Sequence, residues 1–555
     1  MTVTKQLIDN VNKIKTTLNE ISVYNLDVKT AIELYYELAK KVNEVINELS
    51  RFEGVVSDEL IKQNEKLIYL LGEGLKEQVV IKIDNLIKDG TIQDLINNKI
   101  FNELNNKIDT FIQGANEKFN TIERDFNSQL EHKANKNIWG YNQVILPFTF
   151  PKKFNWSGTL PNVKLKGDGQ CIHNIDVSNY EIKGKTYYVD IKTGLGDNDG
   201  LSPETPLSNI QVAIDKGDAD TIIVGSGWYE HNHGYASKGV LINSSKKPVS
   251  IKAKGDGDVY ISANSYNLSF SLEGDYTNVY SASRSGVGRV IDIKYKDNVG
   301  EFLELTKVSS IAEVENRANS YFTDNVKVYI HTKDNRNPDS DIKCLFNTIY
   351  PLQFHKDLYL EGINLIGGKS PLKGGSGAKL YAKDCEFKFS TLENGISINS
   401  SFGVLQNCNA SNNYLDGFNY NGGNIIETDC KAFRNGIIGI GLVDTQNGST
   451  QHNGGKIIRI NCEYGYNKGS NLGDNHSNTQ SVNFNIISHD SNSETERYNS
   501  NFTAHTNANV WLVNCVSYGS KRDFLAEEGA KLYYNSDTIN YNNFSIEGSG
   551  SIVNE

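Results

Sequence analysis

The sequence predicts a mainly β solenoid preceded by an α-helical N-terminal region. A short sequence motif, called the Cys phrase below, recurs at intervals of 23, 22, 32 and 53 residues. It consists of an apolar run, an Asp or Asn, and a Cys directly after it. The five phrases contain Cys385, Cys408, Cys430, Cys462 and Cys515. A period near 22 residues, lengthened where loops are inserted, is typical of a solenoid. After Trp139 the composition changes from Lys, Glu, Leu and Ile to Gly, Asn, Ser, Tyr and Val, which marks the boundary between the two regions.

Residues 1–135 form the predicted helical region. The segments Leu7–Ile21 and Thr30–Leu49 place apolar residues three and four positions apart, which is the period of an α-helix. The apolar stripe is too narrow for a single helix to bury alone, so we expect a self-associating bundle or coiled coil. An intramolecular helical hairpin is the alternative.

The next segments lead into the solenoid. Residues 136–185 contain three Pro residues between short apolar runs and are interpreted as a connector. The stretch Tyr187–Asp215 then predicts a strand, a Gly/Asp turn and a short amphipathic helix over Pro206–Ile214. The first coil of a solenoid exposes its apolar interior unless something covers it, so we expect this helix to cap the solenoid.

Each Cys phrase is interpreted as one rung of the solenoid. The apolar run before the Cys is a strand, and the Asp or Asn directly before the Cys suits a turn with left-handed backbone geometry. The five Cys then form a buried, reduced interior column of small apolar side chains. Because buried carboxylates would repel one another, we expect Asp384 and Asp429 on the more solvated side of this corner. In the long gap before Cys515, we expect Ser488 in the Cys position of a degenerate copy.

Two further segments depart from the repeat. Residues 255–350 are rich in β-forming residues but lack the period, so they predict an insertion on one face of a solenoid that spans residues 186–535. Residues 536–555 are expected to form a C-terminal strand or tail.

Charge and composition exclude several classes of protein. The chain of 555 residues has a net charge of −11, which argues against nucleic acid as a partner because binding to phosphates needs clustered Lys and Arg. No apolar run is long enough to predict a membrane span, and the first residues lack the apolar core of a secretory signal. The Cys lie at least 22 residues apart, which excludes CxxC motifs for zinc or redox chemistry.

Several stretches resemble known families. The order of YVD, GDNDGLSPETP, a short helix and TIIVGSGWYE, followed by the coil phrases, resembles the pectate-lyase-like right-handed parallel β-helices. Leu86–Asp109 resembles N-terminal helical segments of tail proteins from phages of low-GC Gram-positive hosts, and Asp444–Tyr464 is similar to coils of phage appendage proteins. This resemblance implies a homotrimeric tail spike or tail fibre in the virion tail, assembled in the host cytoplasm. Its N-terminal region would attach to other tail proteins, and its β-helix would act on a polymer at the host cell surface.

A cluster of His and carboxylates marks the candidate site. Four of the ten His lie within 54 residues. The candidate catalytic residues are Asp444, His452, Asp474, His476, His489, Asp490 and His505. Asp444 follows Cys430 at the same spacing as His476 follows Cys462, so adjacent coils are expected to place these two side by side. The candidate substrate-binding residues are Glu494, Glu496, Lys521, Arg522 and Asp523.

The residue types of this cluster allow two kinds of chemistry. A His–carboxylate pair supplies a general acid or base near neutral pH. Two His and two carboxylates equally suit a divalent metal ion that activates water. No other cofactor is indicated.

Two classes of function stay open. In the first, the protein is a depolymerase that hydrolyses or eliminates a cell-envelope polymer. The appendage resemblance favours teichoic acid, whereas the negative charge of the protein favours a neutral or amino-sugar exopolysaccharide. In the second, the same face binds the polymer during host adsorption without cleaving it.

Overall fold

A computed structural model describes the chain from residue 145 onward. The described ranges are 145–166, 171–231, 234–235, 239–399, 402–436, 447–493, 499–535, 538 and 544–554. The predicted helical region over residues 1–135 lies outside them, and so does the expected coiled coil.

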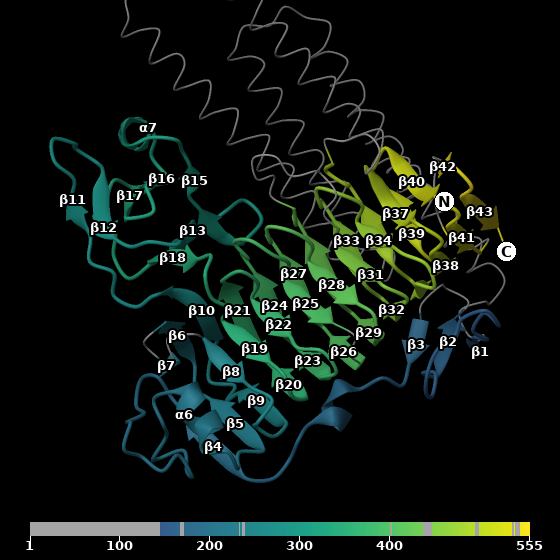
Figure 1. Ribbon diagram of the computed structural model, residues 1–555, viewed down its shortest axis with the longest axis horizontal. Helices are drawn as coiled ribbons and strands as arrows, with labels where there is room; N and C mark the ends of the chain where they lie inside the picture. Colours follow the sequence, from purple (N-terminus) through teal and green to yellow (C-terminus); the bar gives the residue numbers. More distant parts are fainter. Residues whose placement is uncertain are drawn as a thin grey trace, which may run out of the picture. The chain divides into compact units, whose positions relative to one another are not determined.

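Three parallel sheets form successive coils around a common interior (Figure 1). The first sheet contains β4 (Thr186–Val189), β5 (Thr221–Val224), β9 (Val249–Ala253), β20 (Leu358–Glu361), β23 (Leu380–Lys383), β26 (Phe402–Gln406), β29 (Asn424–Thr428), β32 (Lys456–Ile460), β35 (Gln480–Phe484), β38 (Asn509–Val513), β41 (Lys531–Tyr534) and β43 (Ser551–Asn554). The parallel strands of the second sheet are β6 (Gly227–His231), β7 (Gly234–Tyr235), β10 (Val259–Ser265), β21 (Ile363–Gly367), β24 (Glu386–Lys388), β27 (Asn409–Ser411), β30 (Lys431–Phe433), β33 (Glu463–Gly465), β36 (Ile487–His489) and β39 (Val516–Tyr518). The third sheet contains β8 (Val240–Ile242), β19 (Leu352–Phe354), β22 (Leu372–Gly374), β25 (Ile396–Asn399), β28 (Phe418–Asn421), β31 (Ser449–His452), β34 (Leu472–Asp474), β37 (Ser500–Ala504), β40 (Arg522–Glu527) and β42 (Phe544–Glu547).

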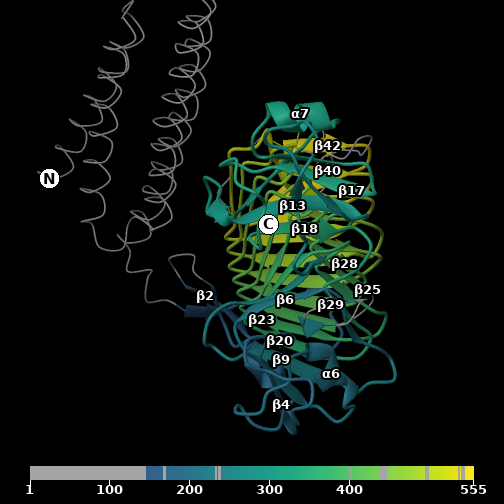
Figure 2. The same cartoon turned by 90° about the vertical axis from the view of Figure 1, so that its left-hand side faces the viewer.

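The predicted solenoid is therefore a parallel β-helix. Equivalent residues of neighbouring coils pair one to one, as Ile426 does with Ile458 and Ile458 with Val482. Figure 2 shows the strands of successive coils stacked as rungs. The pairing of β43 with β41 continues the coils as far as Asn554, beyond the boundary at 535 that the period indicated.

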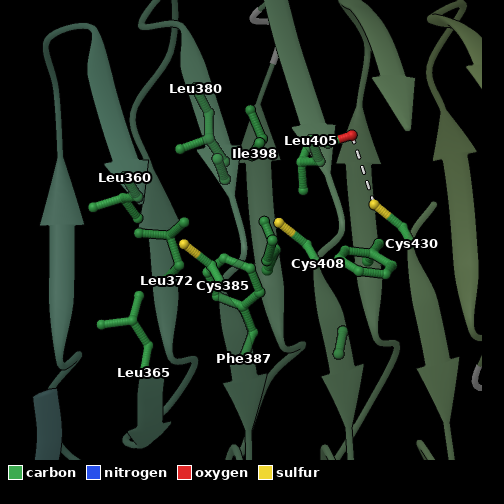
Figure 3. Packing of buried hydrophobic residues seen from close by; sticks show 14 of the residues in the cluster. Leu360, Leu365, Leu372, Leu380, Cys385, Phe387, Ile398, Leu405, Cys408 and Cys430 are labelled. Atoms are coloured by element: carbon green, nitrogen blue, oxygen red, sulfur yellow. Dashed lines mark hydrogen bonds between the residues drawn. The ribbon is translucent and has the colours of Figure 1, made fainter. Parts of the chain in front are cut away.

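The five repeated Cys form the predicted interior column. All five are free and at most 1% exposed. Figure 3 shows Cys385, Cys408 and Cys430 pointing into the same interior among Leu and Phe side chains. The residue before each Cys has a positive φ of 51° to 55°, which confirms the left-handed corner. Asp384 is exposed at this corner, as expected.

One copy of the phrase differs from the expectation. The register of β36 on β33 places Ile486 beside Cys462, so Ile486 occupies the Cys position of this coil. Asn485, with a φ of 51°, forms its corner. The prediction for Ser488 was wrong for two reasons. An Ile fills the interior column as well as a Cys does, and the corner is marked by the Asn before the column position rather than by a small residue in it. Ser488 lies two residues further along the coil.

A column of buried Asn side chains holds the corner between the second and third sheets. Asn413 Nδ2 donates to Asn435 Oδ1 at 3.0 Å, and Asn435 Nδ2 donates to Asn467 Oδ1 at 2.9 Å. Asn467 continues the column to Asn471 at 2.9 Å. All four are fully buried, and buried amides are stable only when they are hydrogen-bonded. The column fixes the turns that lead into the third sheet.

A short helix caps the first coil. α6 (Ile210–Asp215) begins later than the predicted helix, because the side chain of Asn209 accepts hydrogen bonds from the first free backbone N–H groups. Ile210, Ala213 and Ile214 are buried in the interior cluster of the first coils. The helix contacts β4, β5 and β8, which is the place expected of a cap.

Residues 145–166 and 171–180 form a strap across the outer face of the first sheet. The elements of this strap are β1 (Ile145–Pro147), β2 (Val163–Lys166), β3 (Cys171–His173) and a 3-10 helix (Val177–Tyr180). The Phe148 ring meets Phe484 edge to face with centroids 4.6 Å apart, and Tyr180 stacks on Tyr381 at 4.4 Å. The strap therefore covers the apolar stripe made by the residue four positions before each Cys.

The insertion leaves the second sheet after β10 and returns before β19. Its elements are β11 (Ser271–Leu272), β12 (Tyr280–Ser283), β13 (Val287–Lys296), β14 (Phe302–Glu304), β15 (Thr306–Lys307), α7 (Ile311–Asn316), β16 (Ser320–Thr323), β17 (Lys327–His331) and β18 (Ile342–Phe346). β11, β12, β17, β16 and β15 form a separate five-stranded sheet, while β18, β13 and β14 extend the second sheet. The insertion starts later than residue 255, because β10 pairs in parallel with β6 and β21 as part of a coil.

The buried thiols should be unreactive in the folded protein. All seven Cys are buried, and burial raises the pKa of the Cys515 thiol to about 12. We expect a thiol reagent to label none of them in the native state within minutes and all of them after unfolding. Cys430→Ala should lower the free energy of unfolding by about 1 kcal/mol through lost packing. Rapid labelling of the native chain would contradict the stacked column.

Candidate functional site

The third sheet brings three of the predicted His together. β31 ends at His452, β34 is followed by His476, and β37 is followed by His505, so the three occupy successive coils at one edge of the sheet (Figure 1). The rings of His452 and His476 have centroids 5.3 Å apart. His505 Nδ1 lies 3.2 Å from the side-chain oxygen of Asn475, the neighbour of His476 in the chain.

His452 is a neutral imidazole on the outer side of the coil. Its Nε2 lies 3.0 Å from Thr450 Oγ1 and 3.4 Å from Asn419 Nδ2. Its Nδ1 is buried and has no hydrogen-bond partner among the described residues. Burial and the neighbouring His476 lower the pKa of His452 to about 4, against the opposing effect of Asp474. An imidazole with this pKa is an unprotonated base over most of the pH range.

A carboxyl group outside the predicted cluster lies beside His452. Asp416 precedes β28 and is only 7% exposed. Its Oδ1 accepts the backbone N–H of Asn447 at 2.6 Å, and its Oδ2 accepts Asn419 Nδ2 at 2.7 Å. Burial raises the pKa of Asp416 to about 6, although both hydrogen bonds act in the opposite direction. Asn419 thus lies between a carboxyl group that keeps its proton up to about pH 6 and a neutral imidazole.

Asp416 is not recognisable from the sequence as a site residue. The residue precedes Gly417, and an Asp-Gly pair between two strands is the ordinary composition of a turn. The distinguishing feature is Asn419, two residues into the next strand, whose side chain points outward and contacts both groups. Only the register of β28 against β31 brings Asn419 to His452.

Asp474, one of the candidate catalytic residues, lies in the interior and not at the exposed edge with the three His. It is fully buried in β34, where both of its oxygens face Arg459 at 2.9 and 3.0 Å. Its Oδ1 also accepts the backbone N–H of Gln451 at 2.9 Å. A buried ion pair of this kind needs such additional hydrogen bonds to offset desolvation. Both oxygens of Asp474 are therefore engaged by Arg459 and the backbone in the interior of the coil.

His489 and Asp490 lie on the second sheet, away from the other three His. His489 Nδ1 is 3.0 Å from Asp490 Oδ2, and Nε2 is 3.3 Å from Glu463 Oε1. The ring stacks on Tyr518 with centroids 5.0 Å apart. Burial disfavours the charged ring, but the hydrogen bonds and charges of Asp490 and Glu463 outweigh it and raise the pKa of His489 to about 9. His489 is thus a buried imidazolium held between two carboxylates.

The remaining candidates within the described residues are Lys521, Arg522 and Asp523, and none of them joins the His edge. Asp444, Glu494 and Glu496 lie outside the described residues, so the expected pairing of Asp444 with His476 is untested. Lys521 is exposed in the turn before β40 and Arg522 is half-buried at its start, at the opposite end of the strand from Glu527, which pairs with His505. Asp523 is buried and accepts the hydroxyl of Ser517 at 2.6 Å.

In the part of the chain that the structure describes, no three His, Cys, Asp or Glu side chains are grouped as ligands of a metal ion. Within the same residues, no helix is long and apolar enough to cross a membrane.

The fold and the site define a parallel β-helix with acid–base groups on a lateral face. The chain is similar to the pectate lyase Pel9A over 65% of this chain and 78% of that chain, with 14% identity and a TM-score of 0.38. It is similar to a glycoside hydrolase over 67% and 96%, with 9% identity and a TM-score of 0.46. It is also similar to XylC in complex with xylose over 64% and 69%, with 13% identity and a TM-score of 0.40.

These similarities concern the fold and carry no argument about the reaction. No protein-family model matches the chain. No curated protein matches it either.

The charged state of His489 should make stability depend on pH. Because the folded-state pKa is raised from 6.5 to about 9, the stabilisation is complete below about pH 6 and is lost as the pH rises through 9. We expect His489→Gln to lower the melting temperature at pH 6, and this difference from wild type to shrink towards pH 10. Thermal unfolding across this pH range measures both values. A difference that is the same at pH 6 and pH 10 would show that His489 acts by packing alone.

Proposed function

We propose that the protein binds and hydrolyses a glycan at the edge of the third sheet. Asp416 is the general acid and His452 is the general base. The observation that supports this assignment is the opposite displacement of the two pKa values, to about 6 and about 4, on either side of Asn419. Pairs of titratable groups whose environments shift their pKa values in opposite directions are a feature of acid–base sites.

The proposed reaction balances without a cofactor. Protonated Asp416 donates its proton to the glycosidic oxygen as the bond from that oxygen to the anomeric carbon breaks. His452 removes a proton from a water molecule, whose oxygen forms the new bond to the anomeric carbon. Exchange with solvent then returns a proton to Asp416 and removes one from His452. His476, with its ring beside that of His452, contributes to the position of the base.

The biological setting that we propose is adsorption of a phage to its host. The resemblance of Leu86–Asp109 and Asp444–Tyr464 to phage tail and appendage proteins supports a tail spike or tail fibre. In this setting the protein is a homotrimer that attaches to other tail proteins through its N-terminal region. The polymer is an exopolysaccharide, or a teichoic acid that contains glycosidic bonds, on the surface of a low-GC Gram-positive bacterium.

A receptor-binding fibre without turnover is the second candidate function. The specific observation in its favour is the confinement of Asp416, which is 7% exposed and has both oxygens engaged in hydrogen bonds. A general acid must come within hydrogen-bond reach of the leaving oxygen. In the binding-only alternative, Asp416 holds Asn419 and the backbone of Asn447 in place and never meets the substrate.

Substitution of the acid and the base should abolish hydrolysis. We expect Asp416→Asn and His452→Gln each to lower kcat/KM by about two orders of magnitude or more, the usual share of general acid–base catalysis. Asp384→Asn is a matched control, because other coils carry Asn at the position of Asp384. Reducing ends released from host surface polymer measure the rate. Wild-type rates in both variants would place the chemistry elsewhere, whereas wild-type protein that binds but releases nothing would favour the binding-only fibre.

The pH dependence should be bell-shaped. The active form needs His452 without a proton, which holds above about pH 4, and Asp416 with a proton, which holds below about pH 6. Activity is therefore expected to rise through pH 4, reach a maximum at about pH 5 and fall through pH 6. A rate that increases steadily up to pH 8 would contradict this assignment of acid and base.

The assembly state is a separate prediction. Light scattering of the full chain should give a particle with three times the 61.8 kDa mass of one chain. Charged substitutions in the apolar stripe of Leu7–Ile21, such as Ile14→Asp with Leu18→Asp, should reduce this mass. The mass of a single chain for the unaltered protein would favour the intramolecular helical hairpin.

A further inference from the structure

A strip of Asn and His side chains runs across the coils at the outer edge of the third sheet. The members of this Asn/His strip are Asn399, Asn421, His452, Asn453, Asn475, His476, His505 and Asn507. They lie at the ends of β25, β28, β31, β34 and β37 or in the turns that follow, and each is exposed or half-exposed. The strip extends the proposed acid–base site in both directions along the stack of coils.

The strip is continuous because its members share a register. Asn421 pairs with His452 on the next coil, and Asn453 Nδ2 donates to Asn421 Oδ1 at 3.1 Å. His505 continues the strip beside Asn475. Neighbouring parallel strands are about 4.8 Å apart, so the strip presents amide or imidazole groups at that interval. Each Asn amide has two donor and two acceptor positions, which suits it to bind hydroxyl groups.

The composition of the strip is unusual for this chain. The described turn residues from which the strip is taken, 422–423, 453–455, 475–479 and 505–508, include no Asp, Glu, Lys or Arg, although these four types make up 22% of the chain. Lys456 begins the strand after one of these turns, but it is buried and its Nζ donates to the backbone carbonyls of Gly454 and Asn478. The outer face of the second sheet, by contrast, carries ion pairs such as Lys431–Glu463 at 3.0 Å and Lys388–Glu386 at 2.8 Å. Charged groups are therefore concentrated on another face of the same coils.

We infer that the strip binds an electroneutral, hydroxyl-rich glycan that lies along the stack of coils. This inference rests on the proposed function, because the strip contains His452 of that site. A polyanion such as polyglycerol phosphate is recognised by Arg and Lys, which pair with its phosphates. The strip offers neither, and its end towards β40 meets Glu527 and Glu528, which repel anions. Among the polymers of the proposed function, the neutral exopolysaccharide fits the strip and the teichoic acid does not.

Substitutions that add a charge to the strip test whether the ligand is neutral or anionic. Asn507→Lys and Asn507→Asp add opposite charges at an exposed corner. Asn267→Lys is the matched control, because Asn267 is also exposed, has a similar φ of 49° against 59°, and lies at the start of the insertion, outside the strip. For a neutral ligand, both changes at Asn507 should weaken binding by about threefold or more, to a similar degree. For a polyanion, Lys would strengthen binding and Asp would weaken it, which would overturn the inference.

The probes are surface polymers extracted from low-GC Gram-positive strains. Strains are chosen to which the labelled full-length protein adheres. Anion exchange separates each extract into a neutral and an anionic fraction. We expect the full chain carrying Asp416→Asn to bind the neutral fraction, with affinity that changes less than twofold between low and high salt. Binding confined to the anionic fraction, or to no fraction, would overturn the inference. If the neutral fraction binds but wild-type protein releases no reducing ends from it, the hydrolytic function fails while the inference about the ligand stands.

Discussion

The constraint on which the rest of the structure depends is the one-to-one register between coils. Because each strand pairs in parallel with its equivalent in the next coil, a side chain meets the side chains of the same position about 4.8 Å away. Only side chains that pack or hydrogen-bond favourably against a side chain of the same type can occupy such a column. Cys and Ile pack in the interior, left-handed Asn and Asp form the corner, and Asn amides bond to one another at the next turn. The same rule aligns the Asn/His strip.

The buried ion pair links the interior to the candidate site. Arg459 extends from the first sheet to Asp474 in the third sheet, and Asp474 accepts the backbone N–H of Gln451. Gln451 directly precedes His452, so this hydrogen bond fixes the strand that presents the base. Glu427, also buried, accepts Ser449 Oγ at 2.8 Å at the other end of the same strand. These buried charges therefore act on the site by positioning β31 from within.

The sequence predicts more of the fold than of the candidate site, and the register between coils explains the difference. Within one Cys phrase, the apolar run indicates a strand, the Asp or Asn indicates the corner, and the Cys indicates the interior. One short motif was therefore enough to predict the β-helix and its buried thiols. The site depends on which of three sheets a residue joins, and closeness in the chain does not carry that information. His476 and His489 are close in the chain, yet they lie on different sheets. Asp416 belongs to the coil before His452 and is recognised only when Asn419 is placed beside it.

The three faces of the β-helix differ in what they leave open to a polymer. The strap covers the apolar outer stripe of the first sheet. The second sheet carries the insertion, and charged side chains on its outer face are paired with one another. Among the described residues, the third sheet presents a run of Asn and His hydrogen-bonding groups at an exposed edge. A neutral glycan needs hydrogen-bond partners at regular spacing rather than charge. The constraint that stacks Cys in the interior supplies that spacing on the outside, which makes this edge the part of the fold best suited to hold such a chain beside Asp416 and His452.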